Sequence, residues 1–269
     1  MLILRDIKMN FSDLGLSEKT IKAIDEIGIK EPTTVQADVI PSILEGKDVF
    51  TIAPQGCGKT MSYVLPLLDI ISNKKAQTIL IITPNSNSSV MVSDQLAIFN
   101  KYHSENEETT EEDIENEANV IIGSPDLLLE VIECEKADIT STNILVVDDI
   151  NLIKKNKQLD NLEKILSMLP AEKQNIVYTN RRSKETQSVL EKILKAPEEI
   201  KVDKDKEKEA QKNAVSAHSN LQKNKNHQQF ISIIDDEAVK LAKKTKAFNN
   251  KVPEFILIKG ILAEDNKDR

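Results

Sequence analysis

The chain has 269 residues and a formal net charge of −8; 39% of its residues are hydrophobic, but only 3% are aromatic. This hydrophobic share can build a globular core of Ile, Leu and Val, whereas the acidic charge disfavours indiscriminate binding to a phosphate backbone. The first apolar run contains Asp6 and is too short for a signal peptide, and no run is long enough for a membrane span. Cys57 and Cys134 lie far apart in the sequence, which favours reduced thiols and a cytoplasmic location.

Short apolar runs alternate with longer amphipathic segments over the first 200 residues. The runs are nearly continuous in apolar character, which is typical of strands buried on both faces of a parallel sheet. The expected strands are Asp48–Ala53, Thr78–Thr83, Asn119–Gly123, Asn143–Asp148 and Gln174–Thr179. The expected helices are Ser17–Ile27, Gly58–Ile71, Ser88–Asn100, Leu127–Ile132, Leu159–Met168 and Ser183–Leu194. This alternation predicts an α/β fold with a parallel sheet sandwiched by helices.

Two segments interrupt the alternation. Ser104–Asn119 holds eight acidic residues and one Ile, which indicates a solvated or disordered excursion. Lys201–His227 is rich in Lys, Glu, Asn and Gln, as flexible linkers are. Beyond them, an amphipathic helix is expected from Phe230 and a short strand from Pro253. The expected division is a domain at residues 1–202, a linker at 203–229 and a partly disordered tail at 230–269.

The most specific motif is APQGCGKT, at Ala53–Thr60, between an expected strand and an expected helix. Its glycines let backbone N–H groups approach phosphate oxygens, and the helix N-terminus adds favourable polarity. In a P-loop of this kind Lys59 reaches the β- and γ-phosphates and Thr60 ligates Mg²⁺. The alternative is a chance Gly-Lys-Thr after a strand, because Ala53 stands where the strict pattern has Gly. The strand–loop–helix context favours the P-loop.

The surroundings of this loop resemble those of the DEAD-box RNA helicases. That family also has Ala at the position of Ala53, and GIKEPTTVQ at Gly28–Gln36 is similar to its Q motif, with Phe11 at the place of an isolated upstream Phe. The resemblance implies a RecA-like domain that binds ATP and Mg²⁺. It also implies that Gln36 hydrogen-bonds the adenine edge, to which an amide can both donate and accept. The implied nucleotide-binding set is Phe11, Gln36, Gln55, Gly56, Cys57, Gly58, Lys59 and Thr60.

Phe11 has a second interpretation. The resemblance places its ring beside the adenine base. Taken alone, the residue is equally consistent with a hydrophobic staple under the helix that starts at Ser17.

The family's Asp-Glu-Ala-Asp motif corresponds to Asp148-Asp149-Ile150-Asn151. The resemblance implies that Asp148 and Thr60 are the Mg²⁺ ligands and that Asp149 and Lys59 are the catalytic residues. Asp149 is one methylene shorter than the family's Glu, which orients the attacking water, and a misplacement of about an ångström can cost about 10²-fold in rate. The alternative for the two acids is a strand end without a role, which the P-loop disfavours for Asp148 and leaves open for Asp149.

The motifs by which the family contacts RNA differ more. Pro84–Ser89 reads PNSNSS where the family has PTRELA, and Ser124–Leu127 reads SPDL where it has TPGR. The acidic run between them would repel phosphate. Asn151 replaces an Asp that the family links to a third motif, which corresponds here to Thr179–Arg181. These changes predict weakened RNA binding and weakened coupling of RNA to ATP.

The resemblance covers roughly residues 10–202 and includes a last strand within Leu194–Val202. The remaining residues are too few for the family's second RecA-like domain, whose arginine fingers can be worth about 10³–10⁵ in rate. We therefore expect a degenerate helicase-like protein that binds ATP and acts as a nucleotide-binding or adaptor module with a protein partner, and no membrane as partner. Two alternatives remain: a weak ATPase or split helicase half, completed in trans by a second RecA-like domain, and a truncated fragment without function.

Overall fold

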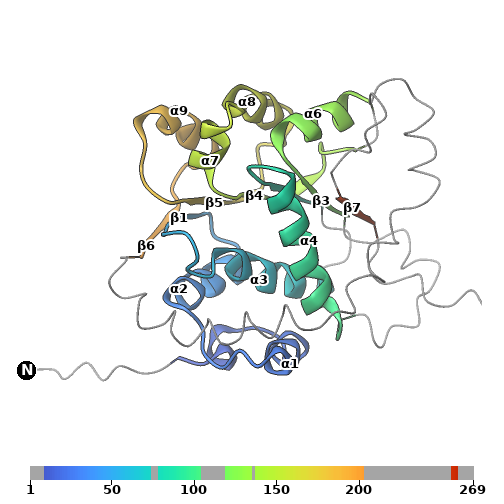
Figure 1. The fold of residues 1–269 in the computed structure, drawn as a ribbon, viewed down its shortest axis with the longest axis vertical. Helices are drawn as coiled ribbons and strands as arrows, with labels where there is room; N and C mark the ends of the chain where they lie inside the picture. Colours follow the sequence, from blue (N-terminus) through green and yellow to red (C-terminus); the bar gives the residue numbers. More distant parts are fainter. Residues whose placement is uncertain (1–8, 74–77, 104–118, 135–136, 203–255, 260–269) are drawn as a thin grey trace, which may run out of the picture.

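The computed structural model describes residues 9–73, 78–103, 119–134, 137–202 and 256–259. These residues form one sheet with helices on both of its faces (Figure 1). The strand order is β6-β1-β5-β4-β2-β3-β7, and the first six strands in this order pair in parallel. The predicted α/β fold is therefore confirmed. The linker at 203–229, the helix expected from Phe230 and the acidic residues 104–118 lie outside the described residues.

The parallel strands overlap the apolar runs that predicted them. Their bounds are β1 Val49–Ile52, β2 Thr78–Ile82, β3 Asn119–Gly123, β4 Thr142–Val147, β5 Gln174–Thr179 and β6 Glu198–Lys201. Strands β1 and β2 are buried along their whole length, which explains their continuous apolar sequences. Strand β7, Ile256–Lys259, pairs antiparallel with β3 at the far edge of the sheet. A short strand thus forms within the stretch that begins at Pro253, as predicted.

The N-terminal elements lie on one side of the sheet. They are the 3₁₀ helix η1 Phe11–Leu14 and the helices α1 Glu18–Ile27, α2 Thr34–Leu44, α3 Lys59–Asn73 and α4 Ser86–Asn100. Helix α1 lies farther from the strands and packs against α3 and α4. Sequence analysis did not predict α2, which contains Pro41. A capping box starts this helix: the Thr33 hydroxyl accepts from the Gln36 backbone N–H, and the Gln36 side chain accepts from the Thr33 N–H.

The opposite face carries four helices in the described parts of the chain. They are α6 Pro125–Glu133, α7 Ile150–Lys155, α8 Leu159–Met168 and α9 Lys184–Ile193. Sequence analysis did not predict α7, whose six residues are too few to show helical periodicity. None of the helices in the described parts of the chain is long and apolar enough to cross a membrane.

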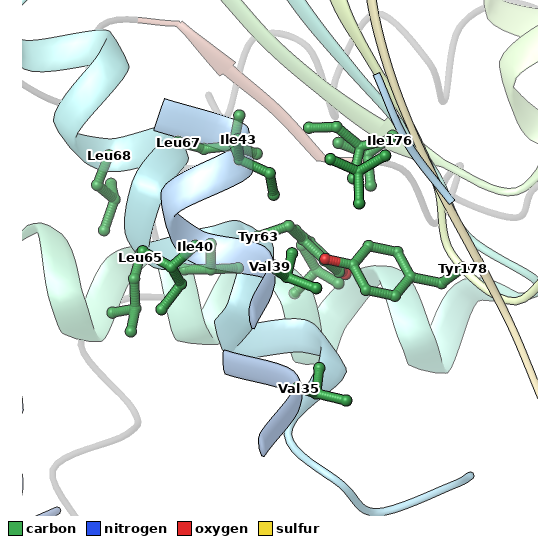
Figure 2. Close-up of a cluster of buried hydrophobic side chains, with 14 of the residues drawn as sticks. Val35, Val39, Ile40, Ile43, Tyr63, Leu65, Leu67, Leu68, Ile176 and Tyr178 are labelled. Carbon is green, nitrogen blue, oxygen red and sulfur yellow. The ribbon is translucent and has the colours of Figure 1, made fainter. Parts of the chain in front are cut away.

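The core beneath the N-terminal face holds helix α3 firmly. Figure 2 shows the apolar residues of α2 and α3 gathered against β5. Tyr63 and Tyr178 are fully buried there, with ring centroids 5.4 Å apart. The buried Ser62 hydroxyl lies 2.8 Å from the Tyr178 phenol and donates to the Lys59 carbonyl. Because these contacts lie in the first turns of α3, they fix the loop that precedes it.

Candidate nucleotide-binding site

The loop between β1 and α3 turns sharply on two glycines. Gly56 and Gly58 have φ angles of 85° and 91°, in the left-handed region that favours glycine. A Cβ at Gly58 would also lie 2.6 Å from Gln36 Nε2 and 2.9 Å from Thr33 Oγ1. Glycine is therefore required at this position for both its backbone conformation and the close packing of α2.

The Lys59 ammonium folds back onto its own loop. Its Nζ donates to the carbonyl oxygens of Ala53 and Pro54, each at 3.1 Å. The buried Cys57 thiol donates to the same Pro54 carbonyl at 3.0 Å. Gln55 and Gly56 form the exposed crest of the loop. The positive charge thus lies at the N-terminus of α3, where anions are favoured, and is bonded to neutral carbonyls that phosphate oxygens could replace.

Asp148 follows β4 and lies close to this lysine. Its Oδ2 accepts a hydrogen bond from the Tyr63 hydroxyl at 3.3 Å, and Tyr63 also interacts with the Thr60 side chain. Burial, with a smaller contribution from nearby Asp149, raises the pKa of Asp148 to about 6 against the opposing effect of the Lys59 charge. The two predicted Mg²⁺ ligands, Asp148 and Thr60, thus both interact with the phenol of Tyr63.

These two side chains fit a magnesium ion. A hydroxyl and a carboxylate are hard oxygen donors of the kind that Mg²⁺ prefers. Because burial disfavours the charged form of Asp148, a divalent cation beside it would supply the compensating charge. Sequence reasoning missed Tyr63, although its position three residues after Thr60 places both on one face of α3.

Asp149 uses its carboxylate in a different way. It is a non-glycine residue with a left-handed φ of 55°, a conformation that costs energy. Its Oδ1 accepts from the Leu152 backbone N–H at 3.2 Å and so caps helix α7. The predicted catalytic acid is therefore engaged as a helix cap, and a role toward an attacking water stays a prediction.

Asn151 connects the acidic motif to the end of β5. Its Nδ2 donates to Thr179 Oγ1 at 2.7 Å, to the Arg181 carbonyl at 2.6 Å and to Asn180 Oδ1 at 3.1 Å. Since the Arg181 carbonyl can only accept, these contacts assign the amide orientation. The buried Oδ1 of Asn151 has no hydrogen-bond partner among the described residues. Residues 151 and 179–181 are thus linked through an amide donor.

The two residues predicted to contact adenine are both buried. Gln36 accepts from the Thr33 N–H at 3.0 Å, and its Nε2 donates to the Gly58 carbonyl at 3.3 Å, which ties α2 to the P-loop. Phe11 is only 4% exposed and packs into the apolar core. Its burial supports the staple interpretation, while base contacts by both residues stay predictions.

The residues at the predicted RNA-facing positions bond mainly to one another. Asn85 caps α4 by accepting from the Ser88 N–H at 3.0 Å. The Ser124 hydroxyl donates to the exposed Asp126 carboxylate at 2.6 Å. The Asn85 oxygen and the Asp126 carboxylate thus serve local turns, and the negative charge of Asp126 disfavours a phosphate beside it.

The fold and the loop together define a P-loop nucleotide-binding domain of RecA-like architecture. A protein-family model described as DEAD/DEAH box helicase matches residues 33–189, more than half of the chain. The chain therefore belongs to the DEAD/DEAH box helicase family.

Relatives and solved structures agree with this assignment. The chain is 28% identical over 204 residues to the DEAD-box ATP-dependent RNA helicase RhpA of Helicobacter pylori, covering 72% of this chain and 42% of that protein. It is 25% identical over 262 residues to the ATP-dependent RNA helicase DeaD of Haemophilus influenzae, covering 93% of this chain and 43% of that one. The crystal structure of a DEAD box protein from Methanococcus jannaschii superposes with a TM-score of 0.64 at 22% identity, over 81% of this chain and 64% of that chain. The chain thus spans about two-fifths of these two relatives' length.

Proposed function

We propose that this domain binds ATP with Mg²⁺ and serves as a nucleotide-binding or adaptor module that does not unwind RNA by itself. The observation that carries the proposal is the position of Lys59, at the N-terminus of α3 and beside the partly buried Asp148. A cationic donor and a helix N-terminus suit the phosphates, and Asp148 with Thr60 suits the metal. When bound, the metal would neutralise phosphate charge and orient the nucleotide.

Gln36 retains capacity for the adenine edge despite its two bonds. An amide has two N–H donors and an oxygen with two lone pairs. One N–H is committed to the Gly58 carbonyl and one lone pair to the Thr33 N–H. The second donor and the second lone pair would read the base, while the existing bonds keep α2 against the loop.

Slow or absent hydrolysis is the second part of the proposal. The cap of α7 holds the Asp149 carboxylate through Oδ1, which fixes its position and leaves only Oδ2 for an attacking water. Near the positions where the family contacts RNA, Asp126 adds a negative charge. Both features support a domain that reports nucleotide occupancy to a partner.

A split helicase half or a weak ATPase is a second candidate. The observation that favours it is the amide bridge from Asn151 to Thr179 and Arg181, which mechanically joins the acidic motif to the end of β5. A nucleotide-dependent movement of one segment would be transmitted to the other, as a domain completed in trans would require.

The direct test is a titration with a fluorescent ADP or ATP analogue, comparing wild type with Lys59→Ala. Loss of a charged hydrogen-bond donor to phosphate is expected to weaken binding by about 10–100-fold. Lys192→Ala removes a lysine on α9 that pairs with Glu163 at the surface, and this variant should bind as wild type does. Equally poor binding by wild type and Lys59→Ala would overturn the proposal.

The absence of autonomous helicase action is tested by phosphate release with and without single-stranded RNA. We expect less than about twofold stimulation, since few cationic donors serve the RNA-facing positions. Robust stimulation of the isolated chain would show that these sequence changes do not weaken RNA coupling. Stimulation that requires an added second RecA-like domain would favour the split enzyme.

A further inference from the structure

A buried polar cluster lies toward the far end of α3 from the P-loop. It joins Asp69 of α3 to Ser17 and Thr20 at the start of α1 and to His103 just after α4. Asp69, Thr20 and His103 are only 2%, 0% and 3% exposed. The nucleotide site makes no use of this cluster, yet a buried carboxylate is costly unless it is well bonded.

Asp69 accepts hydrogen bonds from Ser17, the N-cap of α1, and from Thr20 in its first turn. Its Oδ2 accepts from the Ser17 backbone N–H, and its Oδ1 from the Ser17 hydroxyl, both at 2.6 Å. The Thr20 hydroxyl also donates to Oδ1. A carboxylate at a helix N-terminus is favoured by both the free N–H groups and the helix dipole. The charge of Asp69 therefore fixes the start of α1 onto α3.

His103 closes the cluster in one defined tautomer. Its Nε2 lies 2.8 Å from Thr20 Oγ1 and 3.6 Å from Asp69 Oδ1. Since the single hydroxyl proton of Thr20 goes to the carboxylate, the hydroxyl oxygen must accept from His103, and Nε2 must carry the proton. The buried Nδ1 has no hydrogen-bond partner among the described residues. The neutral ring therefore fits this environment, and a second proton on Nδ1 would be buried unpaired.

The same elements are also joined at the surface. The Lys101 ammonium and the Tyr102 hydroxyl both donate to the carboxylate of Glu26 near the end of α1, at 2.7 Å and 3.0 Å. These side chains are about half exposed, and exposed ion pairs contribute little. This outer pair supplies a matched control for the inner cluster.

We propose that Asp69 and His103 are positioning residues that hold α1, and with it Phe11, against the P-loop helix and thereby set the affinity of the nucleotide site for the adenine base. The proposal rests on the proposed function. Helix α3 carries Lys59 in its first turn and Asp69 two to three turns later, so one rigid element would place both the phosphate-binding and the base-binding parts of the site. Phe11 lies in η1, immediately before α1, and is buried in the same apolar layer.

The experiment compares Asp69→Asn with Glu26→Gln in two measurements. The first is amide hydrogen exchange over Glu18–Ile27 in nucleotide-free protein, and the second is affinity for ADP and for inorganic tripolyphosphate. In Asp69→Asn, an amide N–H₂ must face either the Ser17 N–H or two hydroxyls, and the charge is lost. We expect exchange to rise about tenfold and ADP affinity to fall about tenfold, with tripolyphosphate binding unchanged. Glu26→Gln should leave the exchange rate, the ADP affinity and the tripolyphosphate affinity within about twofold of wild type.

His103 is tested by a matched pair. His103→Gln retains an N–H donor toward Thr20 and should keep most of the ADP affinity, whereas His103→Phe leaves the Thr20 hydroxyl without that donor and should behave like Asp69→Asn. Equal effects on ADP and tripolyphosphate would indicate general destabilisation and would overturn the positioning role. Unchanged amide exchange and unchanged ADP affinity in Asp69→Asn would also overturn the positioning role. Failure of wild type to bind ADP would instead overturn the proposed function, while exchange in α1 would still decide whether the cluster holds that helix.

The pH dependence of amide exchange in α1 distinguishes the positioning role of His103 from simple packing. Burial lowers the pKa of His103, so the folded state favours the neutral ring. Protection of α1 should be complete above about pH 6.5, the ordinary pKa of histidine, and should fall as the pH drops below it. The charged groups that act on the ring are Asp69 of α3, which raises its pKa, and Lys19 of α1, which lowers it. Lys22 and Lys101 act instead on Glu26. His103→Gln should abolish the dependence, and its persistence in that variant would assign it to another group.

Discussion

Two pairs of strands end along the same edge of the parallel sheet, β1 with β4 and β2 with β3. The polar side chains that follow the two pairs have different hydrogen-bond partners. After β1 and β4, Lys59 rests on loop carbonyls, and Asp148 is held by one long phenol bond of 3.3 Å. After β2 and β3, Asn85 caps a helix, and Ser124 donates to Asp126 at 2.6 Å. The charged groups after β1 and β4 can form stronger bonds with a ligand than they have now. The polar side chains after β2 and β3 bond to neighbouring residues of their own turns.

This difference explains why one part of the sheet edge suits a ligand and the other does not. Ligands bind at the carboxyl ends of parallel strands, where helix N-termini also point. A ligand gains affinity there only if it replaces weak bonds with stronger ones. Phosphate in place of two neutral carbonyls is such a gain for Lys59, whereas the Asn85 oxygen already caps a helix and the Asp126 carboxylate would repel a phosphate. Three substitutions test this contrast.

Gly58→Ala should have the largest effect. Its Cβ would lie 2.6 Å from Gln36 Nε2, and the residue has a left-handed φ of 91°. Alanine must therefore move either the loop or α2, and we expect nucleotide affinity to fall on the order of 100-fold, with destabilisation of roughly 2–3 kcal/mol. Nucleotide titration and chemical denaturation measure both quantities.

Gly46→Ala is the matched control. Gly46 also has a left-handed φ, of 76°, but a Cβ there would meet nothing within 4 Å. The backbone cost alone, about 1 kcal/mol, should appear in stability, with nucleotide affinity unchanged. If the two variants lost equal affinity, the close packing of Gln36 on the loop would not matter for binding.

Asp148→Asn should stabilise the nucleotide-free domain while removing its affinity for Mg²⁺-nucleotide. Because the folded-state pKa is raised to about 6, the folded protein binds the proton more tightly than the unfolded chain does. The charged form therefore destabilises the fold above pH 6, and the cost disappears as the pH falls toward 4. Denaturation of both proteins should show a gain of roughly 1–3 kcal/mol at pH 7.5 and almost none at pH 4. A gain independent of pH would contradict the argument.

The sequence was sufficient to predict the parts of the fold that depend on local pattern. Continuous apolar runs predicted the five central strands because both faces of a parallel sheet are covered. The P-loop was predicted because its glycines and Lys59 are contiguous. Helix α2 could also have been found, since Thr33 and Gln36 form a capping box that is readable in the sequence.

The roles of individual side chains could not be read from the sequence in the same way. Asp149 looks like a shortened catalytic acid, but its function as the cap of α7 depends on a left-handed backbone conformation. The bonds from Asp69 to Ser17 and from Thr20 to His103 join residues 52 and 83 positions apart. Such contacts follow from helix packing, which no local periodicity encodes.

Asn151→Asp gives the smallest expected effect and the most specific test of the link to β5. The substitution restores the family's residue, yet it replaces an amide donor with a carboxylate facing the Arg181 carbonyl and the Asn180 side-chain oxygen. Thr179 can rotate its hydroxyl toward the new acid at the expense of its own bond to Arg181, which limits the loss. We expect destabilisation of roughly 1 kcal/mol by chemical denaturation at pH 7.5.

The control for this substitution is Asn180→Asp. Asn180 is exposed and already acts as an acceptor toward Asn151, so a carboxylate there keeps the bond and should change stability by less than about 0.5 kcal/mol. A stabilising Asn151→Asp would mean that the segment at 179–181 can turn its donors toward residue 151. The link between residue 151 and residues 179–181 would then form with either a donor or an acceptor at position 151. The amide of Asn151 would not be a specific adaptation of this chain.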